Sequence, residues 1–110
     1  MSYSESSLQK ALFAKWMMSR ANIFILDEPT RGIDLASKID IYNFINDMTK
    51  KKAGVIYISS DVDEIMGICD RVGVLSNNTL VCDLPTSQTS SEEITAYLIK
   101  SSYNQRGLQT

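Results

Sequence analysis

The sequence predicts an α/β fold: a parallel sheet with flanking helices, then a C-terminal hairpin and a last helix. Three features of the 110 residues indicate it. Apolar runs of strand length alternate with stretches in which apolar residues recur at helical spacing. Pro, Gly or Asn residues separate these segments. Two of the apolar runs contain no alternating polar residues. Runs of this kind are typical of strands buried on both faces of a parallel sheet, whose crossovers are right-handed.

The N-terminal half predicts a helix, a strand and a second helix. Apolar residues of 7–19 recur on one helical face: Leu8, Leu12, Phe13, Trp16 and Met17. The run 23–26 follows as a strand buried on both faces, and Pro29 ends it because proline cannot donate a ladder hydrogen bond. Asp34 is expected to cap a helix over 35–50. The expected buried stripe of that helix is Leu35, Ile39, Tyr42, Ile45 and Met48.

The C-terminal half predicts a strand at 55–58 and then a short helix capped by Ser59 or Ser60. Strands at 72–75 and 80–82 are expected to form a hairpin, because the intervening Asn77 and Asn78 tolerate left-handed backbone. A polar loop over 85–91 leads to a helix from Ser91 to about Ile99, and residues 101–110 are expected to be a flexible tail.

Composition excludes several classes of protein. Eleven Lys and Arg against 13 Asp and Glu give a net charge of −2, without the basic excess of a nucleic-acid binder. The absence of histidine removes Ser-His-Asp and Cys-His catalysis and the usual zinc sites. Cys69 and Cys82 lack CxxC spacing and are expected to be reduced thiols. No apolar run approaches the about 18 residues of a membrane helix, and no leader-like apolar segment is visible.

Two carboxylates follow the first predicted strand. In open α/β sheets ligands bind outside the carboxyl ends of the strands, where Asp27 and Glu28 are expected. Mg²⁺ is typically held by one or two carboxylates together with phosphates and waters. A second carboxylate can orient or deprotonate a water molecule. The pair therefore predicts a magnesium site, although it also suits a simple polar strand exit.

Four stretches carry a family resemblance: FILDEPTRGID at 24–34, IYNFIN at 41–46, ISSDVDEI at 58–65 and DRVGVL at 70–75. Together they closely resemble the second ATP-binding cassette of ABC-type monosaccharide importers, from about Ser4 to Ile99. The resemblance implies a partial P-loop NTPase-like sheet. Residues 1–100 would be the C-terminal part of a cassette, comprising the signature helix, Walker B, D-loop and switch region. The implied cofactors are ATP and Mg²⁺.

The resemblance also implies partners and roles. The partners would be a second ATP-binding cassette and membrane-spanning permease subunits, with the chain in the cytoplasm at the inner face of the membrane and no nucleic acid involved. Asp27 would hold Mg²⁺ through water, and Glu28 would polarise the attacking water. Asp34 would close the loop facing the opposite cassette, a role compatible with helix capping. Ser60 stands at the switch position, where it could hydrogen-bond a phosphate or cap a helix. Ser4 remains from the nucleotide-binding signature.

The sequence departs from the family in two places. No GxxxxGK[ST] occurs in the 110 residues, so the amides that cradle phosphates are missing from them. The family signature LSGGNQQK aligns with residues 3–10, which lack both glycines. Glu5 adds a negative charge, and like charges about 4 Å apart repel by roughly 4 kcal/mol at an effective dielectric near 20. Residues 4–7 therefore fit a helix N-cap better than a phosphate site, and the chain alone is expected neither to bind ATP tightly nor to turn it over.

Two alternatives remain open from the residues. The chain could be a non-catalytic interaction module whose exposed sheet edge pairs with a complete cassette or with a second copy. It could also be a receiver-like or phosphatase-like domain that uses Asp27 and Glu28 with Mg²⁺, for which Asp61 would be a further acid. The run DEPTRGID disfavours the second alternative. The sequence does not indicate which sugar an importer of this kind would carry.

Overall fold

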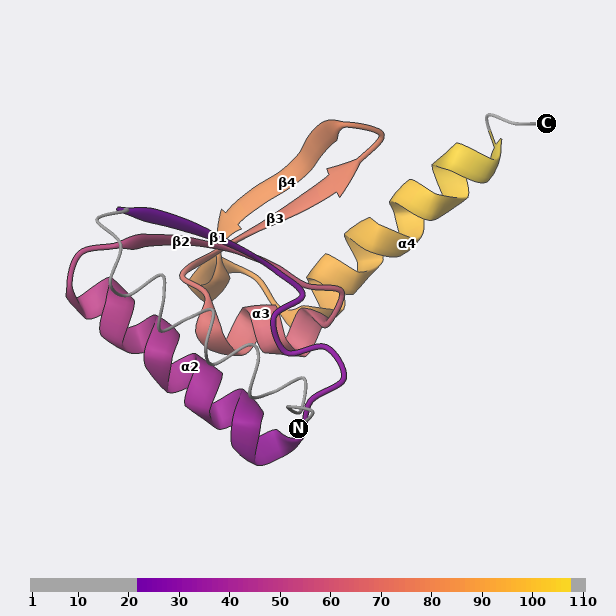
Figure 1. The fold of residues 1–110 in the computed structure, drawn as a ribbon. Coiled ribbons are helices and arrows are strands. Elements are labelled where there is room, and N and C mark those ends of the chain that lie inside the picture. The colour runs from indigo at the N-terminus through magenta and orange to yellow at the C-terminus, as the bar shows by residue number, and fades with distance from the viewer. Residues whose placement is uncertain (1–21, 108–110) are drawn as a thin grey trace. The chain divides into compact units, whose positions relative to one another are not determined.

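The computed structural model describes residues 22–107, without the side chains of 103–107, and this chain forms two compact units. One unit extends to Ser60 and the other starts at Asp61. The helix predicted over 7–19 lies outside the described residues. Figure 1 shows the ribbon with its labelled elements.

The first unit is a β-α-β arrangement. Strand β1 (Ile23–Asp27) and strand β2 (Gly54–Ile58) pair in parallel, and helix α2 (Leu35–Lys50) connects them. In Figure 1 the helix lies along one face of the two strands. The predicted strands, the parallel pairing and the bounds of this helix are therefore confirmed.

The core of the first unit lies between α2 and one face of the sheet. Phe24 and Leu26 of β1 pack with Ile41, Ile45 and Met48 of α2. Burial alternates along β1, so Ile23 and Ile25 are exposed on the opposite face. The expectation that the 23–26 strand is buried on both faces is wrong for the described structure, because α2 covers only one face.

The buried stripe of α2 also differs from the expected one. Ile45 and Met48 are buried as predicted, but Leu35 and Ile39 are exposed, and Ser37 and Ile41 are buried instead. The buried positions 37, 41, 45 and 48 follow the spacing of one helical face. Packing against Phe24 and Leu26 of β1, rather than apolar content alone, sets the buried face of α2.

The second unit packs two helices against a hairpin. Its regular elements are α3 (Val62–Ile68), β3 (Arg71–Ser76), β4 (Thr79–Pro85), the short 3₁₀ helix η1 (Thr86–Gln88) and α4 (Ser91–Gly107). Strands β3 and β4 pair antiparallel, and Asn77 and Asn78 have positive φ angles of 50° and 62°, as expected for the turn. The core of this unit is Val72, Val74, Cys82 and Ile94. The described residues contain no helix that is both long and apolar enough to span a membrane.

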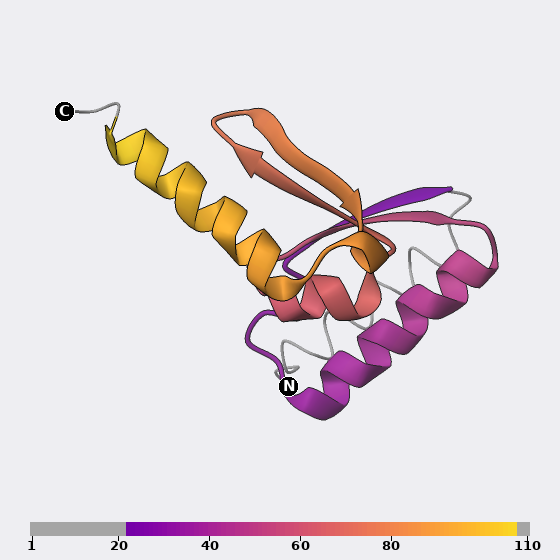
Figure 2. The same ribbon diagram turned by 180° about the vertical axis from the view of Figure 1, so that it is seen from behind.

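Two boundaries in the second unit correct the sequence prediction, and one confirms it. Asp61, rather than Ser59 or Ser60, caps α3, since its Oδ1 accepts from the Glu64 amide at 3.1 Å. The predicted start of α4 at Ser91 is confirmed, and the Oγ of the preceding Ser90 accepts from the Glu93 amide at 3.2 Å. Helix α4 continues to Gly107 instead of ending near Ile99, as its yellow end in Figure 2 shows.

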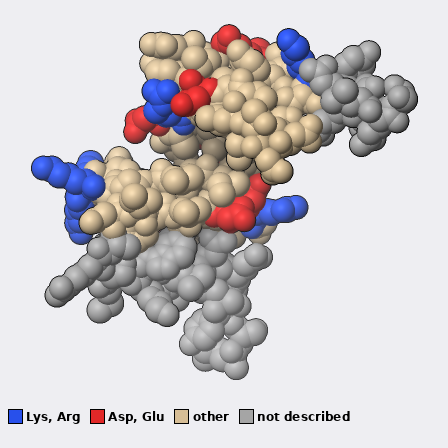
Figure 3. Space-filling model, turned by 90° about the horizontal axis from the view of Figure 1, so that it is seen from above, with Lys and Arg blue, Asp and Glu red and all other residues tan. Residues whose placement is uncertain are grey.

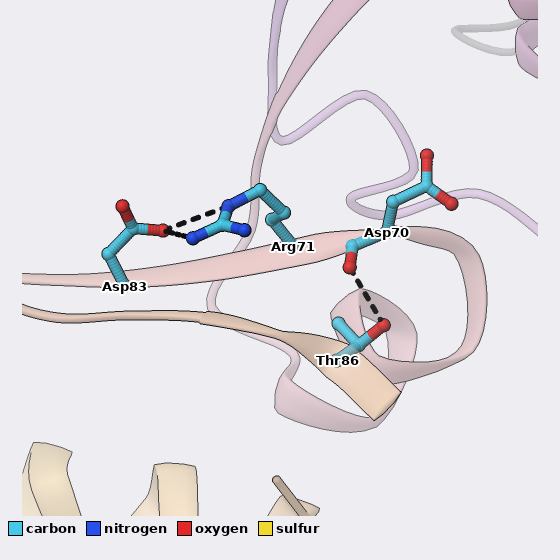
Figure 4. A network of polar contacts seen from close by, with 4 residues as sticks. All are labelled: Asp70, Arg71, Asp83 and Thr86. Carbon is cyan, nitrogen blue, oxygen red and sulfur yellow. Dashed lines mark hydrogen bonds and ion pairs between the residues drawn. The ribbon is translucent and has the colours of Figure 1, made fainter. Parts of the chain in front are cut away.

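Polar contacts join the open end of the hairpin to the neighbouring loops (Figure 4). Thr86 donates its hydroxyl to the carbonyl oxygens of Cys69 and Asp70, at 2.8 and 3.2 Å. The Arg71 guanidinium donates twice to one carboxylate oxygen of Asp83, at 3.0 and 3.2 Å. Both of these charged side chains are exposed, so their ion pair contributes at most about 1 kcal/mol.

Two isoleucines of α2 provide a matched test of the core. Ile41 is 1 % exposed and Ile39 is 48 % exposed. We expect Ile41→Ala to lower the free energy of unfolding by about 2–5 kcal/mol, because it removes buried methyl groups and leaves a cavity. Ile39→Ala should cost less than about 1 kcal/mol. Urea unfolding followed by circular dichroism measures both, and equal losses would contradict the described phase of α2.

Candidate functional site

The candidate site lies where β1 and β2 end. Asp27 is the last residue of β1 and is exposed, and its register partner in β2 is Ile58. Because the strands are parallel, their carboxyl ends lie side by side. The predicted position of Asp27 and Glu28 at the carboxyl end of a strand in a parallel sheet is therefore confirmed. Their chemical roles stay predictions.

Glu28 is held in an unusual conformation by the segment that follows β2. Its φ of 49° is in the left-handed region, which typically costs a non-glycine residue about 1–3 kcal/mol. Its amide donates to the Ile58 carbonyl at 2.8 Å. Its carboxylate oxygen Oε1 accepts from the Ser60 amide at 2.9 Å. Main chain and side chain of Glu28 are thus both tied to the end of β2.

The loop after Glu28 folds back on β2. Thr30 is buried, and its hydroxyl lies 3.3 Å from the hydroxyl of Tyr57, within hydrogen-bond distance. The Arg31 amide donates to the Glu28 carbonyl at 3.2 Å, and Gly32 has a φ of 75° that glycine adopts without strain. This compact turn leads the chain from the site into α2.

Asp34 caps α2 as the sequence predicted. Its backbone is extended, and its Oδ1 accepts from the Ser37 amide at 2.7 Å. Its carbonyl accepts from the Lys38 amide at 3.0 Å. This geometry accounts for an acid at position 34, and a contact with a second cassette stays a prediction.

The structure brings together three of the five predicted site residues. Asp27, Glu28 and Ser60 lie at the ends of neighbouring strands, Asp34 lies at the far end of the loop, and Ser4 lies outside the described residues. Sequence reasoning missed the Thr30–Tyr57 contact and the Ser60 amide. The hydroxyl of Tyr57, near the end of an otherwise apolar strand, was a sequence signal for a polar contact there. The Ser60 amide belongs to the main chain, so the identity of the residue gives no sequence signal for its contact.

The acidic side chains of the described residues could hold a metal ion only together with ligands from outside them, such as waters and phosphates. Residues 22–107 contain no group of three or more Asp, Glu, Cys or His side chains that could hold a metal ion. Mg²⁺ often takes one or two carboxylates and fills its remaining positions with waters and phosphates. Asp27 fits that role. Asp61, which a receiver-like domain would require, caps α3.

Neither cysteine is suited to nucleophilic chemistry. Burial, followed by the charges of Asp70 and Glu64, raises the pKa of the Cys69 thiol above its ordinary value of 9.0. Burial is also the first cause that raises the pKa of Cys82. Because the thiolate is the reactive form, a raised pKa disfavours nucleophilic chemistry at both residues. Both are free thiols, as expected.

Known proteins similar to the chain include sugar-import ATP-binding proteins, although no protein-family model matches it. The ribose import ATP-binding protein RbsA of Corynebacterium glutamicum is 38 % identical over 96 residues, 87 % of this chain. Galactose/methyl galactoside import ATP-binding proteins MglA of Clostridium perfringens and Haemophilus influenzae are each 42 % identical over 93 residues, 84 % of the chain. The chain spans 18 % of the length of these relatives.

Solved structures share the fold at lower sequence identity. MJ1267, an ATP-binding cassette of an ABC transporter, matches 84 % of this chain with a TM-score of 0.68 and 19 % identity. The match covers 35 % of that chain. UvrA2 from Deinococcus radiodurans matches 79 % with a TM-score of 0.63 and 17 % identity, over 12 % of its chain. The predicted P-loop NTPase-like α/β fold is thereby confirmed.

The capping role of Asp34 can be separated from any other role. We expect Asp34→Ala to lower the free energy of unfolding by about 1 kcal/mol, because the Ser37 amide loses its acceptor. Asp34→Asn keeps a side-chain oxygen that can cap the helix, so it should lower the free energy of unfolding by only a few tenths of a kcal/mol. Urea unfolding of the three proteins tests the expectation, and an Asn variant as unstable as the Ala variant would argue against capping.

Proposed function

The chain belongs to the family of ATP-binding proteins of ABC-type sugar importers, and on this basis we propose that it supplies the carboxylate side of an ATP-hydrolysing site in such an importer. The observation that carries the proposal is the Asp27–Glu28 pair at the joined ends of two parallel strands, with Glu28 fixed by the Ser60 amide. Relatives named for ribose and galactose import support the sugar class.

Each residue has a chemical task in this proposal. Asp27 would hold Mg²⁺ through water, and the ion would supply positive charge to offset that of the phosphates of ATP. Glu28 uses Oε1 to accept from the Ser60 amide, which leaves Oε2 to accept a hydrogen bond from the attacking water. The family resemblance would give Asp34 and Ser4 roles toward the second cassette and its nucleotide. The partners are that cassette and the membrane-spanning permease subunits, so the chain works in the cytoplasm at the inner membrane face.

The phosphate cradle must come from another segment. The 110 residues contain no GxxxxGK[ST], and scattered lysines do not replace preorganised amides. We therefore propose that residues 1–100 correspond to the C-terminal part of the second cassette, and that the 110-residue polypeptide by itself binds ATP weakly and does not turn it over.

A second candidate function is a non-catalytic interaction module. The sheet of the first unit has two strands, so within the described residues β1 and β2 each keep one unpaired edge. Such an edge can add a strand from another chain. This candidate requires binding to a complete cassette that does not depend on Glu28.

We expect Glu28 to be essential when a phosphate cradle is supplied. The test replaces the matching stretch of a ribose or galactose import ATP-binding protein with residues 22–60 of this chain and measures ATP hydrolysis. The chimera should hydrolyse ATP, and Glu28→Gln should reduce turnover by about 10²-fold or more, because a positioned general base contributes about 10²–10⁴-fold.

Asp47→Asn is the matched control for that chimera. Asp47 is an exposed acid in the last turn of α2, far along the chain from the strand ends, and its loss should leave turnover unchanged. A chimera that hydrolyses ATP equally well with Glu28→Gln would refute the proposed role. A chimera without activity that still binds a complete cassette, with or without Glu28→Gln, would favour the interaction module.

Ser60 should act through its main chain. In the same chimera we expect Ser60→Ala to retain turnover, because alanine keeps the amide that donates to Glu28. Ser60→Pro removes this donor and should lower turnover by roughly ten- to a hundred-fold, the equivalent of a hydrogen bond to a charged group at about 1.5–3 kcal/mol. Unchanged circular dichroism must accompany the loss. Equal losses in both variants would assign the effect to the hydroxyl instead.

A further inference from the structure

Glu28 keeps its left-handed backbone against the preference of its own sequence. Pro29 follows it directly, and the residue before a proline is usually extended, because the proline ring crowds the preceding backbone. The φ of Glu28 is nevertheless 49°. A conformation of this kind persists only where the surrounding contacts hold it in place. The contacts on the two sides of Glu28 therefore determine where its carboxylate lies.

The chain before and after Glu28 is held by neighbouring residues of β2. On the N-terminal side, the Glu28 amide donates to the Ile58 carbonyl at 2.8 Å. On the C-terminal side, the Glu28 carbonyl accepts from the Arg31 amide at 3.2 Å and closes a turn with Thr30 at one of its two central positions. The hydroxyl of Thr30 lies 3.3 Å from the hydroxyl of Tyr57. Adjacent residues of β2 thus hold both sides of Glu28.

The contact between the hydroxyls of Thr30 and Tyr57 is partly buried and carries no charge. Thr30 is 6 % exposed, and the Tyr57 ring packs against the core between β1 and α2. Charged side chains gather in groups on the surface (Figure 3), where salt screens their interactions. A neutral and partly buried hydrogen bond is not screened in this way, so the turn after Glu28 has an anchor that does not depend on salt.

We infer that the hydroxyl pair of Thr30 and Tyr57 positions the Glu28 carboxylate. By fixing the turn that follows Glu28, the pair keeps Oε1 within reach of the Ser60 amide, which donates to it at 2.9 Å. Both hydroxyls act through Glu28, so Thr30 and Tyr57 are positioning residues rather than catalytic ones. The inference deepens the proposed function and rests on it for the effect on turnover, whereas the effect on Glu28 concerns this chain alone.

The Ser60 amide proton in NMR spectra of the 110-residue chain tests the inference, because a hydrogen bond to a carboxylate moves such a proton downfield. Tyr57→Phe removes one hydroxyl and keeps the ring. It should move the signal part of the way to its position in Glu28→Ala, where the acceptor is absent. Added to Glu28→Ala, the same change should move the signal no further, because it acts through Glu28. Tyr42→Phe is the matched control, since it removes a tyrosine hydroxyl from α2 and should leave the signal in place.

Thr30 provides variants at the other end of the contact. Thr30→Val removes its hydroxyl and should act as Tyr57→Phe does, whereas Thr30→Ser keeps a hydroxyl and should retain the signal. Combining Thr30→Val with Tyr57→Phe should move the signal no further than either change alone, because both remove one contact. A Ser60 signal that stays in place in Tyr57→Phe, or that moves equally in Tyr42→Phe, would overturn the inference.

Turnover separates this inference from the proposed function. In the chimera that carries residues 22–60, Tyr57→Phe should lower kcat about two- to ten-fold, the equivalent of one hydrogen bond, and leave KM for ATP unchanged. Thr30→Ser should retain kcat. An unchanged kcat in Tyr57→Phe, in a chimera that depends on Glu28, would overturn the positioning role. The expected NMR signals beside a chimera that does not depend on Glu28 would refute the proposed function and support the positioning of Glu28.

Discussion

The parallel register of β1 and β2 is the constraint on which the rest of the first unit depends. It sets Asp27 level with Ile58, so that the Glu28 amide meets the Ile58 carbonyl and the Ser60 amide meets the Glu28 carboxylate. A slip of one residue would exchange the two faces of a strand. Asp27 would then point into the core beside α2, and Leu26 would face outward. The packing of Phe24 and Leu26 against α2 thus also fixes the site.

Within the described residues, α2 covers one face of the β1–β2 sheet. Helix α2 covers the side of Leu26, which leaves Ile23, Ile25 and Asp27 together on the other side. Any layer that packs on these isoleucines therefore borders Asp27. For the proposed hydrolytic function, that layer would be placed to bring phosphates to the carboxylate.

Local chemistry made most of the elements predictable. Pro29 after an apolar run, Asp34 before a helical stretch and Asn77-Asn78 between two short strands each favour one backbone conformation strongly. The phase of α2 was not predictable in this way. Leu35 and Ile39 are apolar yet exposed, and Ser37 is polar yet buried, because the packing partner on β1 selects the face. The two-faced burial expected for 23–26 failed for a related reason, since a strand sequence does not reveal how many layers cover it.

The two carboxylates of the candidate site could be predicted from the sequence. The backbone conformation and the hydrogen bonds that hold them could not. The residues after β1 indicated Asp27 and Glu28, but the positive φ of Glu28 and its bond to the Ser60 amide arise only when β2 lies alongside. Two hydrogen bonds to the end of β2 and the segment after it offset the cost of the left-handed backbone and fix the orientation of the carboxylate. Preorganisation of this kind is what electrostatic catalysis requires. A glycine at position 28 would relieve the strain and remove the acid, so the proposed role of Glu28 would explain why a residue of lower stability stands there.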